Sequence, residues 1–260
     1  MRPKSTNPDD YQHAQRPLGV MQKMFADGTR IGLHHHARAQ CIYARTGLMH
    51  ISTEAALWLI PPQHALWMPS GVAHTMLAQG DVHLQTLYVQ QTLLPPDWQS
   101  ELRVIRVSPL LRELIARAAE IPLEYAENSH EASILQLLLN EIQQSGDAFG
   151  PCLLTARDSR LQYVCEAILA NPADRRNLEE WAQVCGASSR TLARLFQREF
   201  GVSFIVWRQQ VRILSALPRL AAGEPVTRLA LECGYETPGA FTRVFKLLMG
   251  QVPSEYLATL

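Results

Sequence analysis

The 260-residue sequence lacks the apolar runs that a membrane protein needs, because no stretch approaches the about 20 apolar residues that span a bilayer. Its first residues, Met1 to Ser5, do not form the pattern of a signal peptide. Cysteines are few: the five are odd in number and scattered, without C-x-x-C pairs, so they form no disulfide framework. We therefore expect a soluble protein with reduced thiols, located in the cytoplasm.

The sequence also lacks an overall charge, since 24 Lys and Arg residues balance 24 Asp and Glu residues. The charges are unevenly divided, with 13 basic and 10 acidic residues in residues 156–260 but 11 and 14 in residues 1–155. Histidine is absent after residue 130, and seven of the nine histidines lie between His34 and His83. The basic excess favours a polyanionic partner for the C-terminal part.

The C-terminal part contains the same pattern twice, first over residues 178–201 and again over residues 226–250. A Cys-Gly pair recurs at residues 185–186 and 233–234. The Arg-x-Phe pattern that follows is one residue further along in the second copy, so the turn before it is one residue longer. An internal repeat of this kind indicates one supersecondary unit used twice.

Each copy predicts a helix, a short turn containing glycine, and a second helix. Leu178, Trp181 and Cys185 recur at the three- and four-residue spacing of one helix face. Ser188 in the first copy and Thr237 in the second are good N-caps for the second helices. A helix-turn-helix unit presents the N-terminal half of its second helix to the DNA major groove.

The predicted outward face of these second helices is basic, and arginine is the side chain that binds guanine edges or phosphate with two hydrogen bonds. The candidate DNA-binding residues are Ser189, Arg190, Ala193, Arg194 and Arg198 in the first copy, and Pro238, Gly239, Thr242, Arg243 and Lys246 in the second. A single copy is equally well explained as a helical hairpin with a solvated charged face. Two copies with matching positions favour DNA binding.

With residues 207–212 between the copies and residues 250–256 closing the second, the pattern resembles the DNA-binding domain of AraC-type transcription regulators over residues 161–260. The resemblance implies double-stranded DNA and RNA polymerase as partners. It also implies a long helix that joins the copies, so that both recognition helices enter successive major grooves. Residues 204–217 would form this helix, and Pro218 is expected to end or kink it.

The N-terminal part predicts many short strands. From residue 18 to residue 91, glycine or proline interrupts the sequence every few residues, and the runs between them, such as residues 48–53, 56–60 and 82–89, are apolar or alternating. Strands of this kind favour a small barrel or sandwich. The polar residues 1–15 before them predict a mobile arm.

A histidine-rich spacing within these strands resembles the first cupin motif, whose elements here are Gly28, His34, His35, His36, Gln40 and Gly47. Residues 69–74, which end in His74, resemble the core of the second cupin motif. The resemblance implies a cupin β-barrel that binds a small-molecule effector, as in the sensing domains of AraC-type regulators. With aromatic residues added, the candidate effector pocket comprises His34, His36, Gln40, Tyr43, Trp58, Trp67 and His74.

The histidines can hold a metal ion or form a polar pocket wall. His34 and His36 share one face of a strand, and Gln40 keeps the same parity. Neutral imidazoles bind Zn, Ni or Fe, so His34, His36, Gln40 and His74 are the candidate ligands of a divalent transition metal. However, Gln40 replaces the glutamate of the family and removes an anionic ligand. The alternative is a wall of hydrogen-bonded histidines around the pocket.

Between the two parts, residues 108–119 and 131–142 predict two helices, of which the second carries an apolar stripe. The stripe consists of Leu135, Leu138, Leu139 and Ile142. In the resembled family such helices mediate dimerisation, which implies a homodimer; packing on the barrel within one chain is the alternative. By composition, residues 145–151 form an interdomain linker.

Taken together, the sequence predicts an α+β protein in three parts: a cupin-like effector-sensing β-barrel at residues 1–95, a helical dimerisation and linker segment at residues 96–152, and an all-α domain with two helix-turn-helix units at residues 153–260. The predicted function is sequence-specific DNA-binding transcription regulation controlled by a small molecule, without enzyme activity. The alternative is a metal-dependent cupin enzyme fused to a helix-turn-helix module. Gln40 argues against that alternative, because an enzyme would need an intact metal set.

Overall fold

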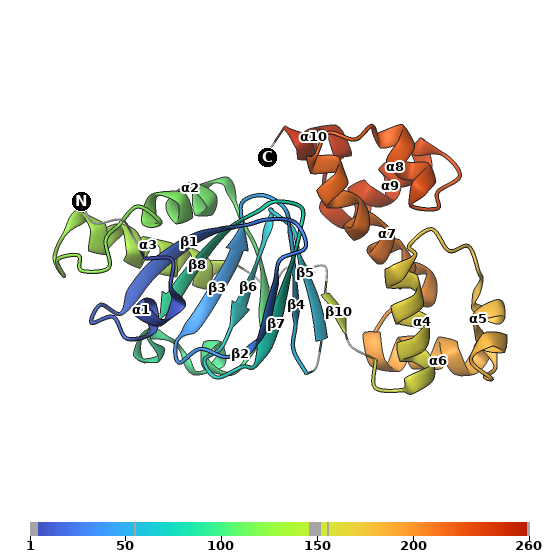
Figure 1. Ribbon diagram of the computed structural model, residues 1–260, viewed down its shortest axis with the longest axis horizontal. Coiled ribbons are helices and arrows are strands. Elements are labelled where there is room, and N and C mark those ends of the chain that lie inside the picture. The colour runs from blue at the N-terminus through green and yellow to red at the C-terminus, as the bar shows by residue number, and fades with distance from the viewer. Residues whose placement is uncertain (1–4, 55, 146–151, 155, 259–260) are drawn as a thin grey trace. The chain divides into compact units, whose positions relative to one another are not determined.

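A computed structural model of the chain describes residues 5–54, 56–145, 152–154 and 156–258 (Figure 1). The chain divides into two compact units, Met1–Thr53 with Ile60–Gly150 and Glu54–Leu59 with Pro151–Leu260. Among the described residues, no helix combines the length and apolar character needed to cross a bilayer. The predicted interdomain linker, apart from Ser145, lies outside the described residues.

The first unit is built on antiparallel β-structure, as the sequence predicts. One sheet has the strand order β1 (Leu18–Phe25), β8 (Val82–Val89), β3 (Ala39–Ala44), β6 (His64–Met68) and β9 (Arg103–Arg106). In a second sheet, β7 (His74–Gln79) lies between β4 (Leu48–Ser52) and β2 (Arg30–His34). Every residue of β3 is buried, because both faces of this central strand are covered.

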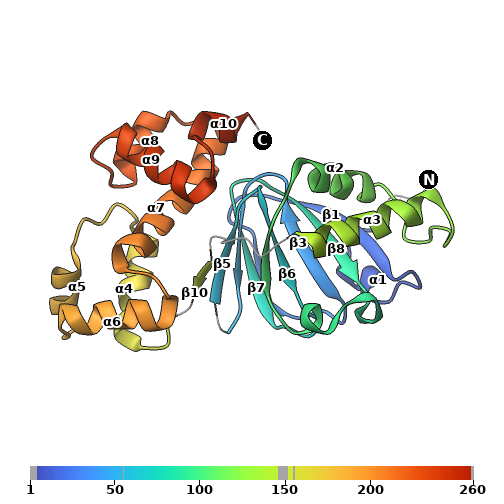
Figure 2. The ribbon, with the colours of Figure 1, turned by 180° about the vertical axis from the view of Figure 1, so that it is seen from behind.

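Two helices pack against the outer face of the first sheet (Figure 1, Figure 2). Helix α2 (Pro109–Ala118) begins at Ser108 and helix α3 (His130–Gln144) at Ser129, and each serine side chain accepts a hydrogen bond from a first-turn backbone N–H. The apolar stripe of α3 joins the core formed by the sheet. The structure therefore has the stripe packed within one chain, and a dimer would need another surface.

The predicted mobile arm is packed against the first sheet over its described residues. Helix α1 (Pro8–Gln12) begins at Asn7, whose side chain accepts a hydrogen bond from the Asp9 N–H. Tyr11 is fully buried, and its ring stacks on Tyr88 with centroids 5.3 Å apart. The prediction is corrected for residues 5–15, because burial of one aromatic side chain outweighs the polarity of its neighbours. Two short 3-10 helices, Gln91–Leu93 and Pro96–Gln99, follow β8.

The second unit contains the repeated pattern. Strand β10 (Cys152–Leu154) pairs with β5 (Ala56–Ile60), and helix α4 (Ser159–Ala170) follows. The first helix-turn-helix unit is α5 (Leu178–Val184) with α6 (Ser189–Phe200), and the second is α8 (Val226–Glu232) with α9 (Pro238–Met249). Helix α7 (Phe204–Ala221) joins them, and α10 (Pro253–Leu257) follows the second. Both predicted helix-turn-helix units are confirmed.

Helix α7 is longer than the sequence predicts. It continues through Pro218 to Ala221 instead of ending at Leu217. Pro218 lies in the last turn of the helix, where the Ala222 N–H still donates to the Pro218 carbonyl at 3.0 Å. A proline removes one backbone donor, and near the end of a helix this loss interrupts little of the hydrogen-bonded ladder. The expected stop at Pro218 is therefore corrected.

Each helix-turn-helix unit has its own aromatic core. Phe196 of α6 lies 5.3 Å from Phe204 and 5.6 Å from Trp207, both on α7, between ring centroids. Phe245 of α9 lies 5.5 Å from Tyr256 of α10. These edge-on and tilted contacts turn one face of each recognition helix inward and leave the other face exposed.

Candidate DNA-binding surface and ligand pocket

The two recognition helices begin with the caps that the sequence predicts. The Ser188 hydroxyl accepts a hydrogen bond from the Thr191 N–H at 3.1 Å at the start of α6. The Thr237 hydroxyl accepts one from the Ala240 N–H at 3.2 Å at the start of α9. Such caps fix the first turn, which is the part of a recognition helix that meets base edges.

The structure places all ten predicted DNA-binding residues outside the core. On α6, Ser189, Arg190, Ala193, Arg194 and Arg198 are exposed; on α9, Gly239, Arg243 and Lys246 are exposed, and Pro238 and Thr242 are half-buried. The opposite faces hold buried Leu192 and Phe196 in α6 and Phe241 and Phe245 in α9. Each helix thus presents one polar face to solvent.

Most of the basic side chains on these faces are available to a partner. Within the described residues, Arg190, Arg194, Arg243 and Lys246 make no ion pair or side-chain hydrogen bond. Arg198 differs, because its Nη2 lies 2.7 Å from Glu199 Oε1. Unpaired guanidinium groups keep all their donors for phosphate or guanine, whereas a carboxylate occupies part of the Arg198 guanidinium.

A cavity of about 170 Å³ lies inside the first unit. Strands β1, β2, β3, β7 and β8 and helix α1 contribute to its wall. Most of the lining is apolar, and His34, His36 and Gln40 are among its polar groups. An apolar cavity with a few converging polar groups is the usual form of a small-molecule site.

The three aromatic residues that were predicted for the pocket lie elsewhere. Side chains alternate along a strand, so β3 turns Gln40 and Ile42 toward the cavity and Tyr43 toward the opposite face. Tyr43 and Trp67 belong to the core under α2 and α3, where the Trp67 Nε1–H donates to the Trp98 carbonyl at 2.8 Å. Trp58, on β5, does not line the cavity either. The assignment of these three aromatics to the pocket is corrected.

Sequence reasoning missed other lining residues. Leu84, Thr86 and Tyr88 face the cavity from alternate positions of β8, and Lys23 does so from β1. The period-two alternation along residues 82–89 was a usable signal, but it does not tell which face is inward. Pro8 also lines the cavity, so the N-terminal segment forms part of its wall.

His34 and His36, which line the cavity, form a cluster with His74, which is not among the lining residues although it was predicted to be one. Ring centroids are 4.3 Å apart for His34 and His74 and 4.9 Å apart for His34 and His36. One ligand atom from each histidine lies within 4.8 Å of the other two. His34 and His74 face each other on the paired strands β2 and β7, which brings the two cupin-like motifs together.

Hydrogen bonds orient two of these rings. The Nδ1–H of His34 donates to the Gly32 carbonyl at 2.8 Å, and that of His74 donates to the Val72 carbonyl at 2.9 Å. With Nδ1 protonated, Nε2 keeps its lone pair, and His74 Nε2 is buried without a protein partner among the described residues. Backbone acceptors of this kind fix the tautomer in metal-binding histidines.

Burial keeps two of the three histidines uncharged. Burial, followed by the neighbouring His34 and His74, lowers the pKa of His36 to about 4. Burial also lowers the pKa of His74, and the hydrogen bond to Val72 offsets part of that effect. At neutral pH these two imidazoles are therefore neutral, which is the form that binds a metal ion.

Gln40 is engaged elsewhere. Its side chain hydrogen-bonds to Tyr88, directly opposite it on β8. The three imidazoles alone fit a divalent transition metal such as zinc, but no carboxylate is among the described residues lining the cavity to offset the charge of the ion.

Comparisons with known proteins agree with this geometry. A helix-turn-helix domain family matches residues 181–259, and an AraC-like ligand binding domain family matches residues 25–142. The HTH-type transcriptional regulator NimR of Escherichia coli K12 is 31% identical over 228 residues, which cover 88% of this chain and 82% of NimR. The chain belongs to the AraC family of transcriptional regulators.

Other relatives are more distant. The arabinose operon regulatory protein of E. coli K12 is 32% identical over 126 residues, which cover 47% of this chain and 41% of that protein. The structure of ToxT from Vibrio cholerae covers 94% of this chain and 99% of that chain at 11% identity and a TM-score of 0.41. The two family matches alone give this AraC-type regulator a C-terminal helix-turn-helix domain that binds DNA and an N-terminal ligand-binding domain.

Proposed function

We propose that this regulator recognises a specific DNA operator through α6 and α9, and that a small molecule in the N-terminal cavity changes this binding. The main support for this proposal is the set of unpaired basic side chains on the outward faces of α6 and α9, both of which begin with a side-chain cap. Arg194 and Arg243 take equivalent places in the two copies, so each unit offers one guanidinium at the same point of its helix. Bidentate contacts from arginine to guanine supply specificity.

The cavity indicates the chemistry of the effector. Its volume of about 170 Å³ suits a small compound, and its apolar lining favours a compound with an apolar body. The compound would direct a polar group toward His34 and His36. An effector shifts DNA binding only if it binds one conformation of the regulator better than another. Pro8 gives the cavity a direct connection to the N-terminal segment, whose packing a ligand would change.

A metal ion is a proposed component of this site. His34, His36 and His74 would hold it, and it would supply a Lewis acid that binds an oxygen or nitrogen of the effector. Because Gln40 is bonded to Tyr88, we propose that it orients Tyr88 and does not act as a ligand. We propose that this site binds an effector without converting it, in keeping with relatives named as transcriptional regulators.

The regulator is proposed to act in the cytoplasm as a homodimer that contacts RNA polymerase. The buried stripe of α3 is unavailable for dimerisation, so a dimer that uses α3 would use its outer face, where Leu137 is 45% exposed. Sedimentation of the Leu137→Asp variant tests this surface, because a charge there would dissociate such a dimer without entering the core.

The operator is tested by selecting DNA from a random pool with the full chain. A recovered common sequence that binds the wild type at least 1,000-fold better than random DNA is expected, since specific and non-specific affinities differ by about this much or more. Recovery of unrelated sequences would contradict the proposal. The metal is tested by elemental analysis of wild type and the His74→Ala variant, where stoichiometric metal is expected in the first alone.

A further inference from the structure

The C-terminal unit contains a second basic feature, a pocket of about 440 Å³ beside α9. Its walls come from α7, from the turn between α8 and α9, from α9, and from the loop before α5. Four arginines line it: Arg175, Arg208, Arg212 and Arg243. Glu236 is the single acidic residue among the described residues that line it, so positive charge dominates the pocket.

Arg212 forms the fixed floor of this pocket. It is 8% exposed, and its Nε donates to the Pro172 carbonyl at 2.9 Å. Its Nη1 donates to the Gly234 carbonyl at 3.0 Å and its Nη2 to the Asp174 carbonyl at 2.9 Å. One buried guanidinium thus holds the loop before α5 and the turn of the second helix-turn-helix unit against α7. These bonds preorganise the pocket.

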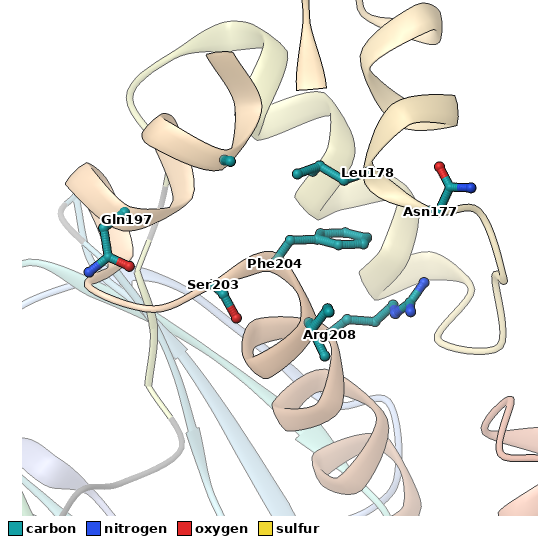
Figure 3. A pocket seen from close by; sticks show the side chains of 8 residues that line it. Asn177, Leu178, Gln197, Ser203, Phe204 and Arg208 are labelled. Atoms are coloured by element: carbon teal, nitrogen blue, oxygen red, sulfur yellow. The ribbon is translucent and has the colours of Figure 1, made fainter. Parts of the chain in front are cut away.

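Arg208 adds a partly occupied guanidinium. Figure 3, which looks into the neighbouring pocket beside α6, shows its side chain extending away from the axis of α7. Its Nη1 donates to the Arg176 carbonyl at 2.7 Å, and within the described residues its other nitrogens have no hydrogen-bond partner. A guanidinium carries five N–H donors, so Arg208 keeps donors for a ligand.

Arg175 and Arg243 are entirely available. Both are exposed, and neither side chain makes an ion pair or hydrogen bond with another described residue. The adjacent carboxylate of Asp174 does not neutralise Arg175, because it is bound by Arg176, whose Nη2 lies 2.5 Å from Asp174 Oδ2. The pocket therefore combines two exposed arginines that lack partners with a buried arginine that fixes its shape.

We propose that this pocket binds a phosphate of the DNA backbone, held by Arg175 and Arg208, both outside the two recognition helices. The proposal rests on the proposed recognition of DNA by α9. Arg243 belongs both to the outward face of α9 and to the pocket wall, so the two sites are continuous. A phosphate contact carries no sequence information but fixes the position of a recognition helix in its groove.

The Arg212 floor gives this contact a further consequence. Because Arg212 ties the second turn to α7, a phosphate in the pocket would be anchored to the second helix-turn-helix unit and not to a separate loop. The phosphate would then set the register of α9 along the DNA.

The test compares the Kd of the full chain for its selected operator and for random DNA of equal length, at several salt concentrations. Arg175→Ala should weaken binding about tenfold on both DNAs, as expected for a lost charged hydrogen bond. It should also make the salt dependence shallower by about 0.9 in the log–log slope. Arg175→Lys should restore most of the slope. Arg106→Ala, which removes an exposed arginine of the first unit, is the matched control and should change neither value.

Three results would overturn the proposal. The first is unchanged affinity of Arg175→Ala on both DNAs, and the second is a loss confined to the operator, which would make Arg175 a base-reading residue. The third is an Arg175→Ala variant that keeps its affinity for DNA but is no longer stabilised against heat by inorganic phosphate. This result would assign the pocket to a free anion. A wild type that does not prefer the operator would instead contradict the proposed function itself, so the two failures are distinguishable.

Discussion

The two helix-turn-helix units share one sequence pattern but are held in different ways. In the first, Asn177 caps α5 in a reciprocal capping box, and the turn glycine Gly186 has open space where a Cβ would lie. In the second, α8 begins at Pro225 without a side-chain cap, and a Cβ on Gly234 would lie 2.7 Å from Arg212 Nη2. The first unit depends on local hydrogen bonds, whereas the second depends on a distant arginine.

The residue that follows the turn glycine belongs to this difference. Tyr235 is buried, packs edge-on against Phe241 with centroids 5.4 Å apart, and lies under the Arg212 guanidinium. Tyr235 takes the place of Ala187 in the first turn, since the Tyr235 N–H donates to the Ala230 carbonyl as the Ala187 N–H donates to that of Ala182. This exchange of alanine for tyrosine supplies an aromatic surface for the arginine. The comparison teaches that a repeated motif can keep its helices while the support for its turn changes from local to long-range contacts.

The largest expected effect is on the stability of the two turns. Gly186 and Gly234 both have positive φ, of 63° and 81°, so alanine at either position should cost about 1 kcal/mol in strain. Gly234→Ala should cost about 1–3 kcal/mol more, because its Cβ would overlap Arg212 and Ala173. Calorimetry of the unfolding of the second compact unit measures the loss of stability in both variants. Equal losses would contradict the different support of the two turns.

The next effect separates the two units on DNA. Arg194→Ala and Arg243→Ala should each weaken operator binding by about 1–3 kcal/mol if each side chain reads a base. Arg198→Ala should have a smaller effect, since Glu199 already pairs with this side chain. Titrations on operator and random DNA check the assignment. A loss of the same size on random DNA would make the residue a phosphate contact.

A smaller effect concerns the caps. Asn177→Ala should cost the first unit about 1 kcal/mol, because two backbone N–H groups of α5 lose their acceptor. The equivalent Pro225→Ala change in the second unit removes no cap hydrogen bond and should cost less than about 0.5 kcal/mol. Hydrogen exchange of the first-turn amides of α5 and α8 distinguishes the two, and equal protection losses would argue against local support.

The smallest effect on the stability of the two helix-turn-helix units should come from pH, because neither helix-turn-helix unit contains a histidine. In the first compact unit, burial lowers the pKa of His64 from 6.5 to about 4. Between these two pH values, His64 is protonated in the unfolded state but not in the folded state. The free energy of unfolding should therefore fall as the pH decreases from 6.5 to about 4. Calorimetry should show a lower unfolding temperature for the first compact unit at pH 5 than at pH 7. His64→Gln should reduce this difference.

Much of the fold could be predicted because its signals are local. The repeat spacing, the Ser188 and Thr237 caps and the strands at residues 48–53 and 82–89 each depend on neighbouring residues. The histidines of the cavity could be predicted from strand parity and motif spacing. Gln40 also lies there, although its bond to Tyr88 depends on pairing between strands and was not predictable.

The remainder depends on contacts between distant residues. The face on which Tyr43 and Trp67 lie is set by the helices that cover the first sheet, and burial of Tyr11 is set by Tyr88. The Arg212 floor requires three carbonyls, 22 to 40 residues away along the chain. Neither the hydrophobic periodicity of the sequence nor its capping residues predict such contacts.

The most direct measurement is a footprint of the full chain on its selected operator, which shows the base pairs that the bound protein protects. We expect two protected major-groove segments, centred about one helical turn, or about 10 base pairs, apart. Arg194→Ala should remove protection from one segment and Arg243→Ala from the other. A single protected segment, or loss of the same segment in both variants, would contradict recognition by two separate units.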